Sequence, residues 1–189
     1  MIRIGILGDI GSGKSFVSKV FGYPVFNADN EVSKLYKKEK AIFIKLNKKL
    51  PKYIFKFPID KNEITAAILD NKNNLKKIIN IIHKEIKKKM KLFLKKNKHK
   101  KIVILDIPLL LENKINNKSD ILVFVESRKE DIEKRIKKRV NFNRRLFNKF
   151  KRIQYSKSYK KRKSDFIIKN DFTKKSVKKG IRNILDKIQ

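Results

Sequence analysis

Short apolar runs and long lysine-rich stretches follow one another along the chain. Residues 2–7 form a β-branched run that ends at glycines, and residues 14–21 have a pattern that is compatible with a helix. A second short strand is expected over 24–27, and Asp29 is expected to open a polar helix. The pattern therefore predicts a strand, a tight turn, a helix and a second strand in this order.

The middle of the chain has a different period. From about residue 38 to residue 101, apolar side chains recur at three- and four-residue steps among lysines, which is the spacing of one face of a helix. We therefore predict an all-helical insertion. Strand patterns return over 102–105, 121–125 and 166–168, and a last helix is expected over 174–187.

These strand patterns are apolar at consecutive positions. Runs of this kind are typical of parallel strands that are covered on both faces, whereas a half-exposed strand alternates. The fold class we predict is α/β, with a doubly wound parallel sheet in a single domain over 1–189. Residues 135–152 contain nine of the basic residues and little apolar periodicity, which indicates a mobile loop or a helical hairpin.

The charge of the chain is strongly positive. In 189 residues, 52 Lys and Arg against 18 Asp and Glu give a net charge of +34. Such a sum suggests a nucleic-acid or anionic-membrane partner. However, 43 of the basic residues are Lys, and together with 28 Ile and 17 Asn they dominate the composition, while Ala occurs four times. A composition bias of this kind favours a solvated lysine coat over a specific polyanion site.

The chain contains no cysteine, which excludes a disulfide framework, a thiolate metal cluster and a cysteine nucleophile. No stretch approaches 18 uninterrupted apolar residues, and the first apolar run is shorter than that of a signal peptide. We therefore expect a cytoplasmic protein without a membrane partner.

One motif carries a defined chemistry. The turn after the first strand fits the phosphate-binding pattern G-x-x-x-x-G-K-[ST] at every specified position, as Gly8-Asp9-Ile10-Gly11-Ser12-Gly13-Lys14-Ser15. Backbone N–H groups of such a loop wrap phosphates, its lysine reaches the β- and γ-phosphates, and its hydroxyl binds Mg²⁺. The motif predicts binding of a nucleoside triphosphate and Mg²⁺, and it leaves the reaction open.

Further segments follow the loop in a fixed order: Asn27-Ala28-Asp29, Ile59-Asp60-Lys61, Ile81-Ile82-His83-Lys84, Pro108-Leu109-Leu110-Leu111-Glu112, the pair Arg135 and Arg139, Gln154, and Ser164-Asp165-Phe166-Ile167-Ile168-Lys169-Asn170. In these segments and in their order the chain resembles the dephospho-CoA kinase family, from residue 2 to residue 170. The chain departs from the family pattern at four positions. Asp9 replaces a glycine and Asn27 replaces an aspartate. Lys61 replaces an arginine and Lys84 replaces a proline.

The resemblance implies a three-layer kinase fold with a five-stranded parallel sheet, a helical substrate-binding insertion over about 38–101 and a basic lid over about 135–152. It implies transfer of the ATP γ-phosphoryl group to the ribose 3′-hydroxyl of dephospho-CoA. The residues to which it assigns roles are Asp29, Lys14 and Arg139 in catalysis, Gly8, Gly11, Ser12, Gly13, Lys14, Ser15, Phe16, Arg139 and Asn170 in ATP binding, Asp29, His83, Pro108, Leu109 and Glu112 in substrate binding, and Ser15 in metal binding.

Simpler roles compete with several of these assignments. Asp29 also suits a helix N-cap, and Asp106 suits either a metal-ordering carboxylate or a strand-end turn. His83 could simply pack on the surface or between helices. Glu112 could form a salt bridge within a loop, and Asn170 could form a turn.

Three alternatives remain open at this point. The first is another small-molecule or nucleotide kinase of the same fold. The second is a nucleic-acid-binding ATPase, against which stand the dispersed lysines and the lack of a recognition motif. The third is a protein with a structural role only, in which the loop is a relic. We expect ATP and dephospho-CoA as partners, no specific nucleic acid, and a monomer or small homo-oligomer.

Overall fold

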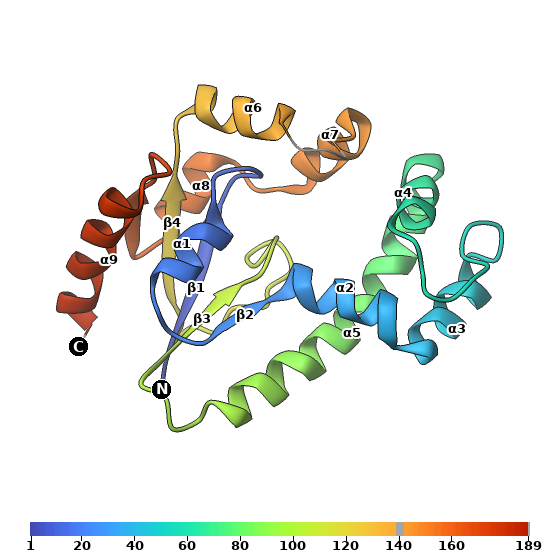
Figure 1. Ribbon diagram of the computed structural model, residues 1–189, viewed down its shortest axis with the longest axis horizontal. Coiled ribbons are helices and arrows are strands. Elements are labelled where there is room, and N and C mark those ends of the chain that lie inside the picture. The colour runs from blue at the N-terminus through green and yellow to red at the C-terminus, as the bar shows by residue number, and fades with distance from the viewer. Residues whose placement is uncertain (139–141, 189) are drawn as a thin grey trace. The chain divides into compact units, whose positions relative to one another are not determined.

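The structure, a computed structural model that describes residues 1–138 and 142–188, contains a parallel five-stranded sheet (Figure 1). The strand order is β2-β3-β1-β4-β5, and every pairing is parallel. The predicted α/β class and the five parallel strands are confirmed. The strands are β1 (Ile2–Gly8), β2 (Val25–Asn27), β3 (Ile102–Asp106), β4 (Ile121–Glu126) and β5 (Phe166–Lys169).

Helices lie between the strands in the sequence. The described residues form α1 (Lys14–Val20), α2 (Ala28–Lys38), α3 (Lys40–Lys49), α4 (Lys61–Asp70), α5 (Lys72–Lys96), α6 (Lys129–Lys137), α7 (Arg144–Ile153), α8 (Lys157–Arg162) and α9 (Lys174–Ile188). Of these helices, α1, α8 and α9 pack against the sheet. Between α6 and α7, residues 139–141 lie outside the described part. A mobile loop or a helical hairpin is expected over residues 135–152. This range contains the end of α6 and most of α7. No helix in the described part of the chain is long and apolar enough to cross a membrane.

The core lies on both faces of the central strand. Ile4 and Ile6 of β1 are fully buried on the face that α1 and α9 cover, together with Ile168 of β5. Leu7 is buried as well, and α8 packs against β1. Since both faces are covered, consecutive strand residues are apolar, as the sequence predicts.

Two compact units share the chain. The first contains residues 1–27, 97–143 and 147–189, and therefore the whole sheet. The second contains residues 28–96 and 144–146 and is built from α2, α3, α4 and α5. The helical insertion expected over about 38–101 lies for the most part in the second unit. The expected organisation as a single domain stays a prediction.

The long helix α5 organises the second unit. Ile78, Ile82, Ile86 and Met90 are buried at four-residue steps, which places them on one face of the helix, and α2, α3 and α4 pack against α5. Lys89 forms an ion pair of 2.9 Å with Glu39 at the start of α3. This unit is held by an apolar stripe with ion pairs at its border.

Two adjacent residues of β5 test which side of this strand packs into the core. Ile168 is 1% exposed and Ile167 is 47% exposed. We expect Ile168→Ala to lower the free energy of unfolding by about 2–5 kcal/mol, because it leaves a cavity against α9. The matched control Ile167→Ala should cost less than about 1 kcal/mol. Urea denaturation of both variants measures this, and equal losses would show that the covered face is assigned wrongly.

Candidate active site

The phosphate-binding loop, residues 8–15, joins β1 to α1 at the carboxyl edge of the sheet. Gly11 and Gly13 have φ angles of 87° and 86°, in the left-handed region where residues with a Cβ are strained. A Cβ on Gly11 would lie 2.9 Å from the Ile136 side chain, and a Cβ on Gly13 would run into the Asn170 amide. Both positions therefore require glycine for conformation and for space.

Two buried side chains bind the backbone of this loop. The Ser12 carbonyl oxygen accepts a hydrogen bond of 2.8 Å from Nδ2 of Asn170 and one of 2.9 Å from Oγ of Ser127. All three residues are buried. Oδ1 of Asn170 in turn accepts from the backbone N–H of Phe172 at 2.9 Å. The residues that follow β4 and β5 thus fix the backbone of the loop.

Lys14, the lysine of the motif, begins α1. Its Nζ donates to the carbonyl oxygens of Gly8, at 3.0 Å, and of Asp9, at 2.9 Å. The backbone N–H of Ser12 also donates to the Asp9 carbonyl, at 3.1 Å. The ammonium group therefore lies along the first residues of the loop, where phosphate oxygens are bound in proteins with this motif.

A short polar chain links the loop to the neighbouring strand ends. Nδ2 of Asn27, the last residue of β2, donates to Asp106 at the end of β3 and lies 3.5 Å from Oγ of Ser15. Asp106 is 3% exposed, whereas Ser15 is exposed. Asn27, one of the departures from the family pattern, thus connects a buried carboxylate to the hydroxyl of the motif.

Asp9, another departure, is paired with a buried lysine. Nζ of Lys160 donates to Oδ1 of Asp9 at 2.6 Å, across 151 residues of sequence. The Lys160 side chain is 3% exposed and the Asp9 side chain is 37% exposed. An acidic residue in the phosphate-binding loop therefore has a dedicated counter-charge.

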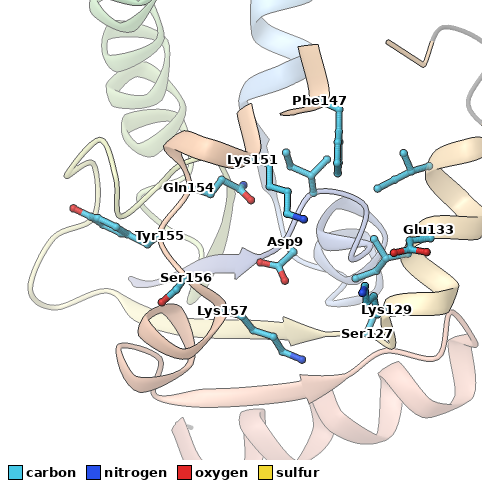
Figure 2. A pocket seen from close by; sticks show the side chains of 13 residues that line it. Asp9, Ser127, Lys129, Glu133, Phe147, Lys151, Gln154, Tyr155, Ser156 and Lys157 are labelled. Carbon is cyan, nitrogen blue, oxygen red and sulfur yellow. The ribbon is translucent and has the colours of Figure 1, made fainter. Parts of the chain in front are cut away.

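A pocket of about 500 Å³ opens beside the loop within the first unit (Figure 2). Ile10 and Asp9 line it from the loop, and Figure 2 shows Lys151 and Asp9 directed into it. Its remaining lining comes from the end of β4, from α6, and from α7 with the start of α8, as Ser127, Lys129, Ile132, Glu133, Ile136, Phe147, Gln154, Tyr155, Ser156 and Lys157. The pocket is thus lined by apolar side chains, by lysines, and by the carboxylates of Asp9 and Glu133.

Arg135, in the last turn of α6, contacts the segment that follows β5. Its guanidinium carbon lies 4.2 Å from the centre of the Phe172 ring, a cation–π contact. Phe172 adopts a φ of 65°, and its ring lies close to Gly13. The segment after β5 therefore joins the end of α6 to the phosphate-binding loop.

Comparisons with known proteins agree with this geometry. A family model described as dephospho-CoA kinase matches residues 2–176. The chain belongs to the dephospho-CoA kinase family. A dephospho-CoA kinase of Wolbachia pipientis wMel is 32% identical over 190 residues, covering 98% of this chain and 97% of the relative.

Solved structures show the same fold. A structure of TT1252 from Thermus thermophilus has a TM-score of 0.78 at 22% identity and covers 100% of this chain and 98% of that one. A dephospho-CoA kinase from Campylobacter jejuni has a TM-score of 0.65 at 21% identity, covering 99% and 97%. The three-layer kinase fold implied by the resemblance is confirmed.

In this member of the dephospho-CoA kinase family, two residues expected to bind ATP have structural partners. The Phe16 side chain packs against the core, and its N–H donates to the Gly13 carbonyl at 3.0 Å. The side-chain amide of Asn170 is engaged by Ser12 and Phe172. The geometry gives both residues a part in shaping the loop, and direct contact with ATP stays a prediction for each.

The segment after β3 has mixed roles. Leu110 is 1% exposed and packs against Gly5 of β1, while Leu109 before it adopts a φ of 57°. Oε1 of Glu112 accepts from the backbone N–H of Tyr155 at 2.8 Å, which ties this segment to the start of α8. The contact of Pro108, Leu109 and Glu112 with substrate stays a prediction.

Asp29 and His83 lie in the second unit. Helix α2 begins at Ala28, so Asp29 lies in its first turn and is not the N-cap that the simpler reading assigns. A carboxylate there interacts favourably with the helix dipole. His83 on α5 is half-buried, and burial lowers its pKa, with a smaller contribution from the nearby charge of Lys87. Arg139 lies outside the described residues.

Sequence reasoning missed three residues of this site: Ser127, Lys160 and Phe172. Ser127 and Phe172 follow strand ends, and this position alone is a weak indication of function. Lys160 is one of 43 lysines, and no local pattern separates it from the coat. Its burial accompanies an ion pair with Asp9, which lies 151 residues away in the sequence.

The support from Asn170 can be tested directly. Asn170→Ala removes one of the two side-chain donors to the Ser12 carbonyl, so we expect ATP binding to weaken about tenfold and the free energy of unfolding to fall by about 1–2 kcal/mol. Calorimetric titration with a non-hydrolysable ATP analogue measures the affinity. Asn183→Ala, an exposed position on α9, is the matched control. Unaltered affinity in Asn170→Ala would contradict the assigned role.

His83 makes stability depend on pH. Because its pKa in the folded state lies below the usual 6.5, the unfolded chain binds the proton more tightly, and stability falls as pH drops through 6.5. His83→Gln should reduce this loss between pH 7 and 5, by at most about 1 kcal/mol for a half-buried group. Thermal unfolding at several pH values measures it, and exposed His99→Gln is the control. The same acid loss in His83→Gln and in unmodified protein would refute the prediction.

Proposed function

We propose that this chain transfers the γ-phosphoryl group of ATP to the ribose 3′-hydroxyl of dephospho-CoA, giving CoA and ADP. The observation that carries the proposal is a glycine-built phosphate loop at the central strand, in a chain that the family model matches over residues 2–176. Family membership gives the reaction class, a phosphotransferase that uses ATP.

The loop supplies the phosphate site. Its glycines keep the backbone clear of side chains, so N–H groups can surround the β- and γ-phosphates. Lys14 needs only a side-chain rotation from its loop carbonyls to reach phosphate oxygens. The buried Ser12 hydroxyl, which has no hydrogen-bond partner among the described residues, supplies a further donor in this cradle. A loose phosphoryl-transfer transition state spreads negative charge over its equatorial oxygens, and cations such as Lys14 stabilise it.

The residues present fit Mg²⁺. Ser15 offers an exposed hydroxyl, and Asn27 joins it to the Asp106 carboxylate, so oxygen donors of the kind that Mg²⁺ prefers lie together. Mg²⁺ usually keeps several waters and is bound by one or two protein oxygens together with substrate phosphates. Bound there, Mg²⁺ would neutralise charge on the β- and γ-phosphates. Ser15 would hold it, and Asp106 would order its shell.

The remaining roles follow the family pattern. We propose that Arg139 stabilises the transferred group, and that Gly8, Gly11, Gly13 and Phe16 shape the ATP site. The segment around Asn170 and Phe172, with Arg135, would lie beside the adenine. Asp29 would orient or deprotonate the attacking hydroxyl, since a carboxylate next to a strand end is suited to proton transfer at this edge of an α/β sheet.

The acceptor would be held by several residues that the family pattern marks: His83, Pro108, Leu109 and Glu112. We propose a cytoplasmic location, no specific nucleic-acid partner, and a monomer or small homo-oligomer. The lysine coat would then act at long range, drawing two anionic substrates to the molecule at low salt.

The lysine of the motif is the most direct test of the phosphate site. Lys14→Met should lower kcat/KM by at least about 100-fold, because it removes charge stabilisation that the transition state needs. A coupled assay of ADP release with dephospho-CoA measures it. Lys19→Met, at an exposed position on the same helix, should remain within about twofold of unmodified protein. Full activity in Lys14→Met would contradict the mechanism.

Asp29 and the acceptor are tested in the same assay. Asp29→Asn, which keeps the shape and removes the charge, should lower kcat by about 100-fold or more if the carboxylate takes the proton. Nucleoside monophosphates and shikimate serve as competing acceptors for the unmodified protein. Turnover with these and none with dephospho-CoA would overturn the proposed acceptor.

A further inference from the structure

Lys160 is a buried cation of the first unit that the proposed mechanism does not use. Its side chain is 3% exposed, and the Asp9 carboxylate lies 2.6 Å from its Nζ. Other lysines near the loop are more accessible: Lys157 and Lys161 pair with Glu126 and are 48% and 35% exposed. Of these three lysines of α8, only Lys160 is buried.

The backbone of Lys160 is well fixed. Ser156 caps α8 with its side chain, and its carbonyl accepts from the Lys160 N–H at 3.0 Å. The Ser164 hydroxyl donates to the Lys160 carbonyl, and α8 packs against β1. The lysine stem is therefore buried from a rigid helix, and its ammonium group emerges at the start of the phosphate-binding loop.

Asp9 occupies a position where a carboxylate is unfavourable for ATP. Its carbonyl accepts a hydrogen bond from Nζ of Lys14 at 2.9 Å, so Asp9 lies beside the lysine that would bind the phosphates. It also lines the pocket beside the loop, as Figure 2 shows. An unpaired carboxylate at this place would repel a triphosphate over a few ångströms, and it would attract Lys14 away from the phosphates.

Each charged group of the pair compensates the charge of its partner. A buried ammonium group without a partner is strongly unfavourable, and Asp9 supplies that partner. In return, Lys160 neutralises Asp9 and holds its carboxylate toward α8, which leaves Lys14 available to ATP. We propose that Lys160 is a positioning residue of the nucleotide site, coupled to Asp9, and that this coupling is what makes an acidic phosphate-binding loop functional.

The proposal rests on the proposed function only in that the loop binds ATP. It can therefore be tested without dephospho-CoA, by calorimetric titration of purified protein with Mg²⁺ and a non-hydrolysable ATP analogue. A wrong acceptor would leave this result unaffected, and a failure here would leave the acceptor assignment unaffected.

The decisive comparison is between a single and a double variant. Lys160→Met exposes the Asp9 charge to the phosphates, and we expect it to weaken analogue binding about tenfold at low salt and less at high salt. Asp9→Gly combined with Lys160→Met removes both charges and should restore the affinity to within about threefold of the unmodified protein. Lys161→Met, the next residue on α8, should change it less than about twofold.

Two results would overturn the proposal. If Lys160→Met binds the analogue as tightly as the unmodified protein, Lys160 does not position the loop. If the double variant remains as weak as Lys160→Met, the lysine acts on the phosphates directly and not through Asp9. Thermal unfolding checks that the variants are folded. Should Lys160→Met fail this check, Lys160→Gln carries the same expectation, again relieved by Asp9→Gly.

Discussion

The burial of β1 between β3 and β4 is the constraint on which the site depends. A fully covered parallel strand cannot shift in register without exposing apolar side chains and breaking hydrogen bonds on both sides. Its carboxyl end is therefore fixed, and with it the start of the phosphate-binding loop. The neighbouring strands end at the same edge, which brings Asn27, Asp106, Ser127 and Asn170 around the loop.

These strand-end residues give the loop its shape. Glycines make the conformation possible, and Ser127 and Asn170 select it through the Ser12 carbonyl. A backbone held in this way keeps its N–H groups oriented before a nucleotide arrives, so little reorganisation is needed at the moment of reaction. Preorganisation and charge are the main contributions a protein can make to phosphoryl transfer.

Local pattern predicted much of this architecture. The five apolar runs became the five strands, the glycine motif became the loop, and the three- and four-residue steps over α5 became a buried stripe. Asp29 shows the limit at an element boundary, since the helix begins one residue before it. Lys160 shows the larger limit: its partner Asp9 is 151 residues away, so the fold and not the local sequence decides that it is buried.

The net charge of +34 by itself does not indicate a function. The informative basic residues are the few lysines and arginines that have a defined partner near the loop. The central proposal is that this chain phosphorylates the ribose 3′-hydroxyl of dephospho-CoA. Phosphorus NMR of the product formed from ATP, Mg²⁺ and dephospho-CoA tests it most directly. We expect a new phosphomonoester at the ribose 3′ position, together with ADP. ADP released without that phosphomonoester would contradict it.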